Sequence, residues 1–141
     1  MTAQATNPLS ACYALLKQAN NQLDAIGEPC RSAIIVNTAI GLVGNGGFPY
    51  FFEMDFPGNP PYERFTEAFR RVGLVDIAER FAQLVSLFPF DAPHASRALR
   101  QQFLDKRPRE FDAAMTQLED LIYALEDSDT VLERHIQGLA P

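Results

Sequence analysis

The stretch VGNGGFPYFFEMDFPGNPPY, residues 43–62, interrupts a chain whose other segments carry helical patterns. It holds four glycines, four prolines and six aromatic residues within twenty positions. A phosphate-binding loop places its glycines between a strand and a helix, usually with a Lys, Ser or Thr, whereas these glycines follow an apolar helical segment and have no Lys nearby. We therefore interpret them as a break that lets the chain leave one helix and start another, with the aromatic residues filling the core. The break comprises Gly44, Asn45, Gly46 and Gly47, and the core-filling aromatic residues are Phe48, Phe51 and Phe52.

The segments on both sides of this stretch predict an all-α fold. Apolar residues recur at steps of three or four, and no strand-like alternation of useful length is present. The predicted helices cover residues 9–26, 30–43, 62–72, 75–88, 91–106 and 109–126, with a short last helix from Thr130. A chain of 141 residues is long enough for one hydrophobic core and too short for two. We predict one all-α domain, residues 1–141, a bundle of about seven helices with one long Gly/Pro/aromatic connection.

The two cysteines, Cys12 and Cys30, raise the question of a disulfide. If the first two predicted helices form an antiparallel hairpin, Cys12 lies about 20 Å from Cys30 at a rise of about 1.5 Å per residue. Bridged Cα atoms lie within about 7 Å of each other. We therefore expect two reduced thiols, which suits the cytoplasm. The N-terminus also lacks a basic region followed by an apolar segment, and no apolar run is long enough to cross a bilayer, so we expect a cytoplasmic protein.

The net charge of −6 is distributed unevenly along the chain. Residues 1–96 carry nine acids and six bases, residues 97–109 one acid and five bases, and residues 110–141 eight acids and one base. The three net charges are therefore −3, +4 and −7. A surface as acidic as the last segment repels nucleic acid and attracts basic proteins. We expect a basic protein, such as a DNA-binding regulator, as the partner, and no direct binding to nucleic acid or to a membrane.

The predicted helix 109–126 arranges its acids in rows. Asp112, Glu119 and Glu126 recur every seven residues opposite the apolar stripe, and Asp120 and Asp127 form a second row. Five carboxylates along about 22 Å of helix axis lie roughly 5 Å apart, against roughly 3.4 Å between the phosphates of one DNA strand. A charged face is usually solvated surface, and the alternative is a surface that meets a basic protein. The candidate partner-binding residues are Asp112, Glu119, Asp120, Glu126, Asp127 and Asp129.

A second candidate site lies at Glu53, directly after the aromatic run. Glu53 and Asp55 would serve as paired carboxylates in acid–base chemistry if the loop closes over a pocket. The alternative is an ion pair between Glu53 and an arginine such as Arg70 or Arg97, which would hold the loop in place. We favour the ion pair, because no nucleophile with a partner base and no dinucleotide fingerprint accompanies these residues.

Metal and cofactor sites are not predicted. His94 and His135 are the only histidines, and neither belongs to a spacing of the His-Glu-x-x-His kind. Asp91 lies three residues before His94 at an expected helix start, so we interpret it as a helix cap rather than a metal ligand. The sequence therefore gives no catalytic residue, no cofactor-binding residue and no metal ligand.

The motif NGGFPYFFEMDFPGNPPYERFTEAFRRVGL, followed by LFPFDAPH and a later arginine-bearing helix, resembles a family of small helical bacterial domains of unknown function that includes a DNA-mimic protein. The resemblance covers roughly residues 32–135. Family members often carry an acid shortly before the Asn-Gly-Gly step, where this chain has Ile40, Gly41, Leu42 and Val43. The family-motif residues, to which we assign a structural role, are Asn45, Gly46, Gly47, Phe48, Phe52 and Glu53.

The resemblance implies an all-helical fold that can form a homodimer. In the DNA-mimic member it implies a carboxylate surface that occupies the DNA-binding face of a transcription regulator, although a shared fold does not by itself extend one activity to a family. We predict a non-enzymatic protein-interaction module that acts as a DNA mimic and uses its acidic C-terminal face. Two alternatives stay open, namely an immunity- or antitoxin-like inhibitor of a basic enzyme, and a small enzyme with a pocket near Glu53.

Overall fold

The structure, a computed structural model, describes residues 7–56, 58–125 and 127–138. These ranges contain seven α-helices and no strand, which confirms the all-α prediction. Two short 3-10 turns, Leu23–Ala25 and Pro93–Ala95, lie between the helices. The helices are α1 (Pro8–Gln18), α2 (Cys30–Glu53), α3 (Glu63–Arg71), α4 (Val75–Ser86), α5 (Arg97–Asp105), α6 (Arg109–Tyr123) and α7 (Ser128–Ile136).

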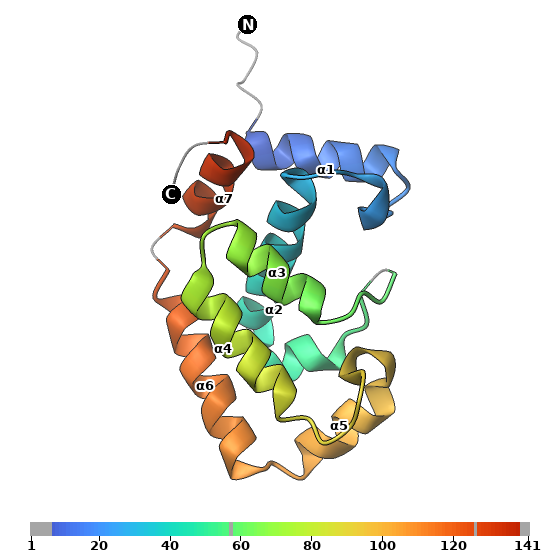
Figure 1. Cartoon of the computed structure of the whole chain (residues 1–141), viewed down its shortest axis with the longest axis vertical. Coiled ribbons are helices and arrows are strands. Elements are labelled where there is room, and N and C mark those ends of the chain that lie inside the picture. The colour runs from blue at the N-terminus through green and yellow to red at the C-terminus, as the bar shows by residue number, and fades with distance from the viewer. Residues whose placement is uncertain (1–6, 57, 126, 139–141) are drawn as a thin grey trace, which may run out of the picture.

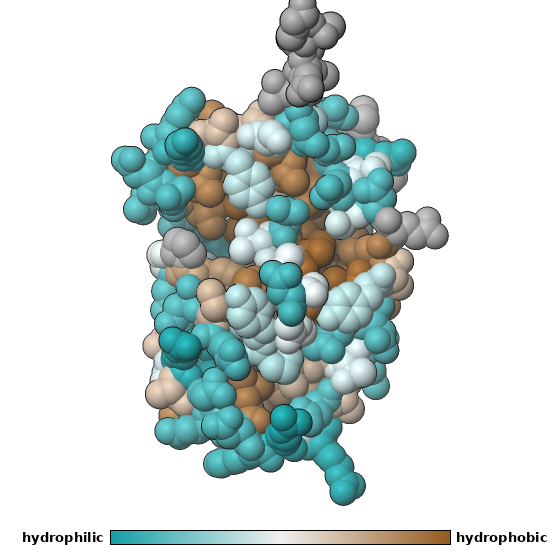
Figure 2. All heavy atoms as spheres, turned by 180° about the vertical axis from the view of Figure 1, so that it is seen from behind, coloured by the Kyte–Doolittle hydropathy of each residue, from teal (hydrophilic) through white to brown (hydrophobic). Residues whose placement is uncertain are grey.

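Helix α2 lies in the middle of the bundle, and the other helices pack around it (Figure 1). Helices α3 and α4 cover one side of it, and α6 runs beside α4. Helices α1 and α7 pack together at the N-terminal end of α2, and α5 packs at its C-terminal end. Seen from behind, hydrophilic side chains dominate the upper and lower parts of the surface, while apolar atoms are visible across the middle (Figure 2). The arrangement gives one large core around the second half of α2.

Helix α2 consists of two helical segments joined at the predicted glycine break. Gly46 has φ −159° and ψ 17°, and Gly47 has φ 70° and ψ −172°, both outside helical values. A positive φ of this kind is strained for any residue with a side chain, so the turn depends on glycine at position 47. Pro49 lies in the first turn of the second segment, where a missing N–H costs nothing. The interpretation of this stretch as an interruption between two helices is confirmed.

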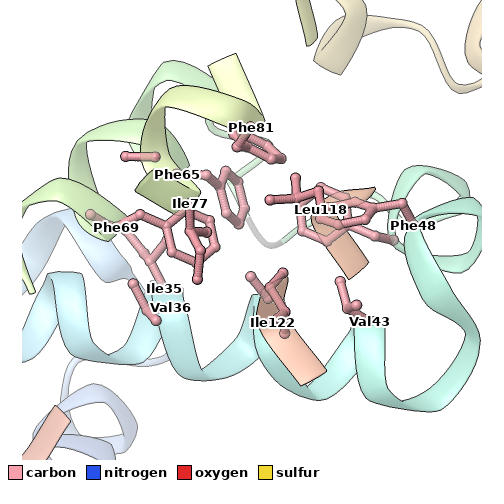
Figure 3. Packing of buried hydrophobic residues seen from close by; sticks show 14 of the residues in the cluster. Ile35, Val36, Val43, Phe48, Phe65, Phe69, Ile77, Phe81, Leu118 and Ile122 are labelled. Atoms are coloured by element: carbon pink, nitrogen blue, oxygen red, sulfur yellow. The ribbon is translucent and has the colours of Figure 1, made fainter. Parts of the chain in front are cut away.

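The aromatic residues after the break form the centre of the core. Phe48, Phe51 and Phe52 are 1%, 0% and 0% exposed. Their rings pack against aromatic rings of other segments, with centroid distances of 5.3 Å between Phe51 and Phe65 of α3 and 5.1 Å between Phe52 and Phe88, which follows α4. Figure 3 shows Phe48, Phe65 and Phe81 gathered with Leu118 and Val43 between α2, α4 and α6. We call this group and its buried apolar neighbours the aromatic core.

The N-terminal region differs from the sequence prediction. Helix α1 ends at Gln18 rather than at Ile26, and Asn20 and Asn21 follow it with positive φ values of 56° and 62°. Residues 19–29 then fold back along α1 instead of extending it. Because the chain returns in this way, Cys12 and Cys30 lie with their Cα atoms 5.1 Å apart and form a disulfide.

The expectation of two reduced thiols is therefore wrong, and the argument for a cytoplasmic location that rested on them falls with it. Its premise, an uninterrupted first helix, placed the two cysteines at opposite ends of a hairpin. Cys12 instead belongs to a second, smaller cluster of buried residues, which we call the N-terminal cluster and which consists of Cys12, Ile26 and Ile34. None of the described helices is long and apolar enough to cross a membrane.

Candidate functional site

Helix α6 places the predicted acidic residues beside the aromatic core. Its apolar stripe is buried, and the stripe consists of Phe111, Met115, Leu118 and Ile122. Asp120 is exposed, and Asp112 and Glu119 are half-buried. The helix ends at Tyr123, so Asp127 is not part of α6 as predicted, and Glu126 lies outside the described residues. The acids therefore do not follow one continuous helix.

Glu119 has a partner inside the molecule. Its Oε2 atom accepts a hydrogen bond from the Phe48 backbone N–H at 2.7 Å, which satisfies a free donor at the start of the second segment of α2. A Cβ atom added at Gly47 would lie 2.7 Å from the same oxygen, so the glycine also makes room for the carboxylate. The Tyr123 hydroxyl donates to the Val43 carbonyl oxygen at 2.9 Å. Helix α6 thus contacts α2 on both sides of the glycine break.

Asp127 begins α7 rather than ending α6. Its carboxylate accepts hydrogen bonds from the Thr130 backbone N–H at 3.1 Å and from the Thr130 hydroxyl at 2.6 Å, as an N-cap does. These hydrogen bonds, led by the one from the hydroxyl, lower the pKa of Asp127. The last helix was predicted to start at Thr130, but α7 starts at Ser128, and the Glu133 carboxylate accepts a hydrogen bond from the Asn7 side chain. Asp127 remains exposed and charged while it caps the helix.

The acids of α6 and α7 lack cationic partners within the described part of the chain. Four ion pairs form among the described residues, and all lie between residues 24 and 100. None of them uses a carboxylate of α6 or α7. The pKa of Tyr123 is raised by burial and by the neighbouring charges of Glu119 and Asp120, which indicates a negative potential at this end of α6. We call Asp112, Asp120, Asp127 and Asp129 the acidic surface.

The second candidate site, at Glu53, is organised by Arg100. This side chain is 0% exposed, and its Nε donates to the Phe52 carbonyl at 2.7 Å. One terminal nitrogen donates to the carbonyls of Pro93 and His94, each at 2.9 Å, and the other contacts Asp55 Oδ1 at 2.7 Å. The guanidinium therefore joins the end of α2 to the turn before α5.

The predicted ion pair at this site exists between other residues. The carboxylate is Asp55 rather than Glu53, and the arginine is Arg100 rather than Arg70 or Arg97. The sequence contained a signal for this arrangement, because Arg100 occupies an apolar position of its helix, three and four residues before Phe103 and Leu104.

The turn before α5 also differs from its prediction. Asp91 does not cap α5, because the positive φ of Ala92, 49°, and a 3-10 turn intervene, and α5 starts after the Ser96 cap. The ring of His94 lies beside Tyr62, with centroids 6.3 Å apart. Burial raises the pKa of Tyr62 to about 12, although the Arg100 charge opposes this shift. Tyr62 therefore stays protonated as part of the core.

The surroundings of Glu53 resemble a structural clamp more than an active site. The Arg100 donors are taken by backbone carbonyls and by Asp55, which leaves the guanidinium occupied. Neither Glu53 nor Asp55 lines the cavities around Ile35 or the cavity between Leu84 and Glu110. Within that part of the chain, no group of three His, Cys, Asp or Glu side chains is arranged to hold a metal ion.

The family model of DMP19-like proteins matches residues 24–138, which is most of the chain. The chain belongs to the DMP19-like family. No curated protein and no solved structure gives a significant match. In this DMP19-like domain, α1 lies before the matched residues, and the disulfide joins it to the first turn of α2. The family assignment agrees with the resemblance seen in the motif, and the match also covers the acidic surface.

Proposed function

We propose that this DMP19-like protein is a non-enzymatic interaction module whose acidic surface binds a basic, DNA-binding protein. The observation that carries the proposal is the set of carboxylates on α6 and α7 that form no ion pair within the described residues. Uncompensated surface charge costs stability through self-repulsion, and it raises the rate at which an oppositely charged partner associates. The net charge of −7 over residues 110–141 gives such a partner a concentrated target.

DNA mimicry is the form of this interaction suggested by the resemblance to a family that includes a DNA-mimic protein. A mimic must present carboxylates where DNA presents phosphates, and each contact then behaves like a phosphate contact in its salt dependence. The acidic surface supplies candidate contacts at Asp112, Asp120, Asp127 and Asp129, from two helices rather than from one row. Glu119 is excluded from this set, because its carboxylate caps the second segment of α2.

The test uses matched charge reversals. Asp112, Asp120 and Asp129 are replaced together by lysine, and the control replaces Asp76, Glu79 and Asp91, which are exposed acids elsewhere on the chain. Partners retained by the wild-type protein from its source cells are purified and titrated by calorimetry at about 50 and 300 mM salt, between which the Debye length shortens to well under 10 Å. We expect the acidic-surface variant to lose at least about tenfold in affinity, or about 1.4 kcal/mol. Equal losses in both variants would contradict the proposal, since net charge alone would then explain binding.

The same partner distinguishes a mimic from an inhibitor of a basic enzyme. A DNA mimic competes with DNA, so increasing amounts of this protein should displace a DNA duplex from the partner, as measured by fluorescence anisotropy. An immunity- or antitoxin-like inhibitor would instead bind an enzyme and reduce its activity without DNA competition. Binding that is insensitive to added duplex would therefore exclude the mimic form.

A further inference from the structure

Three adjoining cavities form a cleft between residues 21–35 and the segment 58–71, away from the acidic surface. Ile35 lines all three, so the cavities meet around this side chain. We call them the apolar cavity, beside Tyr13 and Leu16, the central cavity, beside Asp24, and the cationic cavity, beside Arg31 and Arg71. The central cavity shares Asn21, Leu23 and Pro60 with the apolar cavity and Arg64 with the cationic cavity. The volumes are about 170 Å³ at the apolar end, about 160 Å³ in the centre and about 170 Å³ at the cationic end.

The apolar end is suited to a hydrocarbon group. Its wall is formed by aliphatic and aromatic side chains from α1, α2 and α3, from the 3-10 turn between α1 and α2, and from the loop between α2 and α3. A cavity of about 150 Å³ lined by such residues holds a benzene molecule, so this space accepts an aromatic ring or a short alkyl chain. The apolar wall consists of Tyr13, Leu16, Leu23, Ile34, Ile35, Phe56 and Phe65.

The cationic end carries three arginines, Arg31, Arg64 and Arg71, and two glutamates. Glu28 accepts hydrogen bonds from the Ser32 backbone N–H at 3.2 Å and the Ser32 hydroxyl at 2.8 Å and also pairs with Arg31, so its charge is already shared. Arg71 pairs with Glu67 on the same helix at 2.9 Å. The third arginine, Arg64, pairs with Asp24 of the neighbouring cavity, so this end gathers three arginines, each paired with one acid.

Arg64 is the arginine best placed to receive a ligand. Arg64 lines the central and the cationic cavity, and the next residue, Phe65, lines the apolar cavity. Its guanidinium contacts the Asp24 carboxylate at 2.7 Å, but the side chain of Asp24 is 75% exposed and that of Arg64 is 42% exposed. An ion pair this exposed to water is weak. The Asp24 carboxylate thus marks a position that a carboxylate of a bound molecule can take over without loss of hydrogen bonds.

We propose that this cleft binds a small amphipathic carboxylate, with its hydrocarbon body in the apolar cavity and its carboxylate on Arg64. Arg31 at the cationic end and Thr38 at the apolar end are seven residues apart on α2, which corresponds to about 10 Å along the helix axis. A ligand of this length has the size of a medium-chain fatty acid or an arylalkanoate. The site is independent of the acidic surface and of any protein partner.

The experiment titrates the full chain, disulfide intact, with octanoate and follows heat or amide chemical shifts. Octanol, with a similar chain and a neutral head group, and acetate, with the charge alone, are the matched probes. Octanoate should bind in the millimolar range or tighter, and at least about tenfold more tightly than either probe, because only octanoate fills both ends of the cleft. Absence of octanoate binding at about 10 mM overturns the proposal.

Three variants and one control variant locate the two ends of the ligand. Arg64→Gln should weaken octanoate binding by roughly tenfold, whereas Arg97→Gln, on α5, should leave it unchanged. Asp24→Asn removes the competing carboxylate and should strengthen binding, a gain that damage to the fold would not produce. Leu16→Phe fills the apolar cavity and should weaken octanoate and octanol alike. Equal affinities for the Arg64→Gln and Arg97→Gln proteins, or weaker binding to Asp24→Asn, would overturn the assignment of the carboxylate to Arg64.

Discussion

The aromatic core and the N-terminal cluster are two groups of buried apolar residues that are stabilised by different interactions. The molecule holds two arginine–aspartate pairs with an N···O distance of 2.7 Å, Arg100–Asp55 beside the aromatic core and Arg64–Asp24, in which Asp24 precedes Ile26 of the N-terminal cluster by two residues. The Arg100 guanidinium is fully buried and is surrounded by backbone carbonyls, whereas the side chains of Arg64 and Asp24 are 42% and 75% exposed. A small cluster buries little apolar surface, and here a disulfide links its two helices. Equal distances therefore conceal unequal contributions to stability, because burial and the surrounding acceptors decide the energy.

The largest effect is expected from Arg100→Met. The substitution leaves the carbonyls of Phe52, Pro93 and His94 without their donor, and the side chain of the remaining partner, Asp55, is 52% exposed. A buried acceptor left without a donor costs about 1–3 kcal/mol, so we expect a loss of about 3 kcal/mol or more from the three carbonyls. Urea denaturation followed by circular dichroism measures the free energy of unfolding. Arg97→Met, on the exposed side of the same helix, is the control. A loss below about 1 kcal/mol would show that the clamp is not needed by the aromatic core.

Removal of the disulfide should have the next largest effect. The cysteines are separated by 18 residues, and closing a loop of this length stabilises a protein by about 3 kcal/mol. The double variant Cys12→Ser, Cys30→Ser is compared by thermal unfolding with the wild-type protein in its oxidised and reduced forms. If oxidised and reduced wild-type proteins melt at the same temperature, the N-terminal cluster is held by packing alone.

Glu119→Gln should cost about 1–2 kcal/mol, because a hydrogen bond from the Phe48 N–H to a charged acceptor becomes one to a neutral amide. The comparison variant is Asp120→Asn, an exposed acid on the same helix, for which we expect a change within about 0.5 kcal/mol. Chemical denaturation of the two proteins gives the difference directly. Equal stabilities would mean that the carboxylate does not hold the glycine break.

The aromatic core should also lose stability at alkaline pH through Tyr62. Its pKa is raised to about 12 in the folded protein, so the folded state binds the phenolic proton more tightly than the unfolded state does. This contribution is complete below the ordinary pKa of about 10 and is lost as the pH rises from there towards 12, by about 1 kcal/mol at pH 11. Denaturation midpoints at pH 9 and 11 should therefore differ less for Tyr62→Phe than for the wild-type protein. An identical pH dependence would argue against a buried, neutral Tyr62.

The smallest effect is expected at the exposed pair. Arg64→Gln and Asp24→Asn should each change the free energy of unfolding by less than about 1 kcal/mol, because water screens both partners. Thermal unfolding of the two variants checks this value. A loss comparable with that of Arg100→Met would remove the contrast between the two regions.

The sequence predicted the parts of the fold that depend on local patterns. The apolar periodicity and the Gly46–Gly47 step predicted helices, a break and buried aromatic residues, and the structure confirms these. The first helix was predicted too long, because Leu23 and Ile26 continue its apolar spacing although the chain leaves the helix at Asn20 and Asn21. Local spacing does not reveal such a reversal.

Contacts between distant segments were the main source of error at the candidate sites. Glu119 has the spacing of a solvated acid, and only the three-dimensional arrangement brings it to Phe48, 71 residues away. Arg100 was counted among the basic residues of its segment, while its position among apolar residues indicated burial. A charged residue at an apolar position of a helix should therefore be interpreted first as a buried hydrogen-bond donor.

Helix α6 is hydrogen-bonded to both segments of α2, one on each side of the bend. Glu119 and Tyr123 are four residues apart on α6, about one helical turn or 6 Å. Tyr123 contacts Val43, directly before the glycine break, and Glu119 contacts Phe48, directly after it. The glycines by themselves permit many angles between the two segments of α2. The two contacts with α6 therefore select one of these angles. One residue inserted between Glu119 and Tyr123 would rotate their side chains by about 100° relative to each other, so that α6 could contact only one of the two segments of α2.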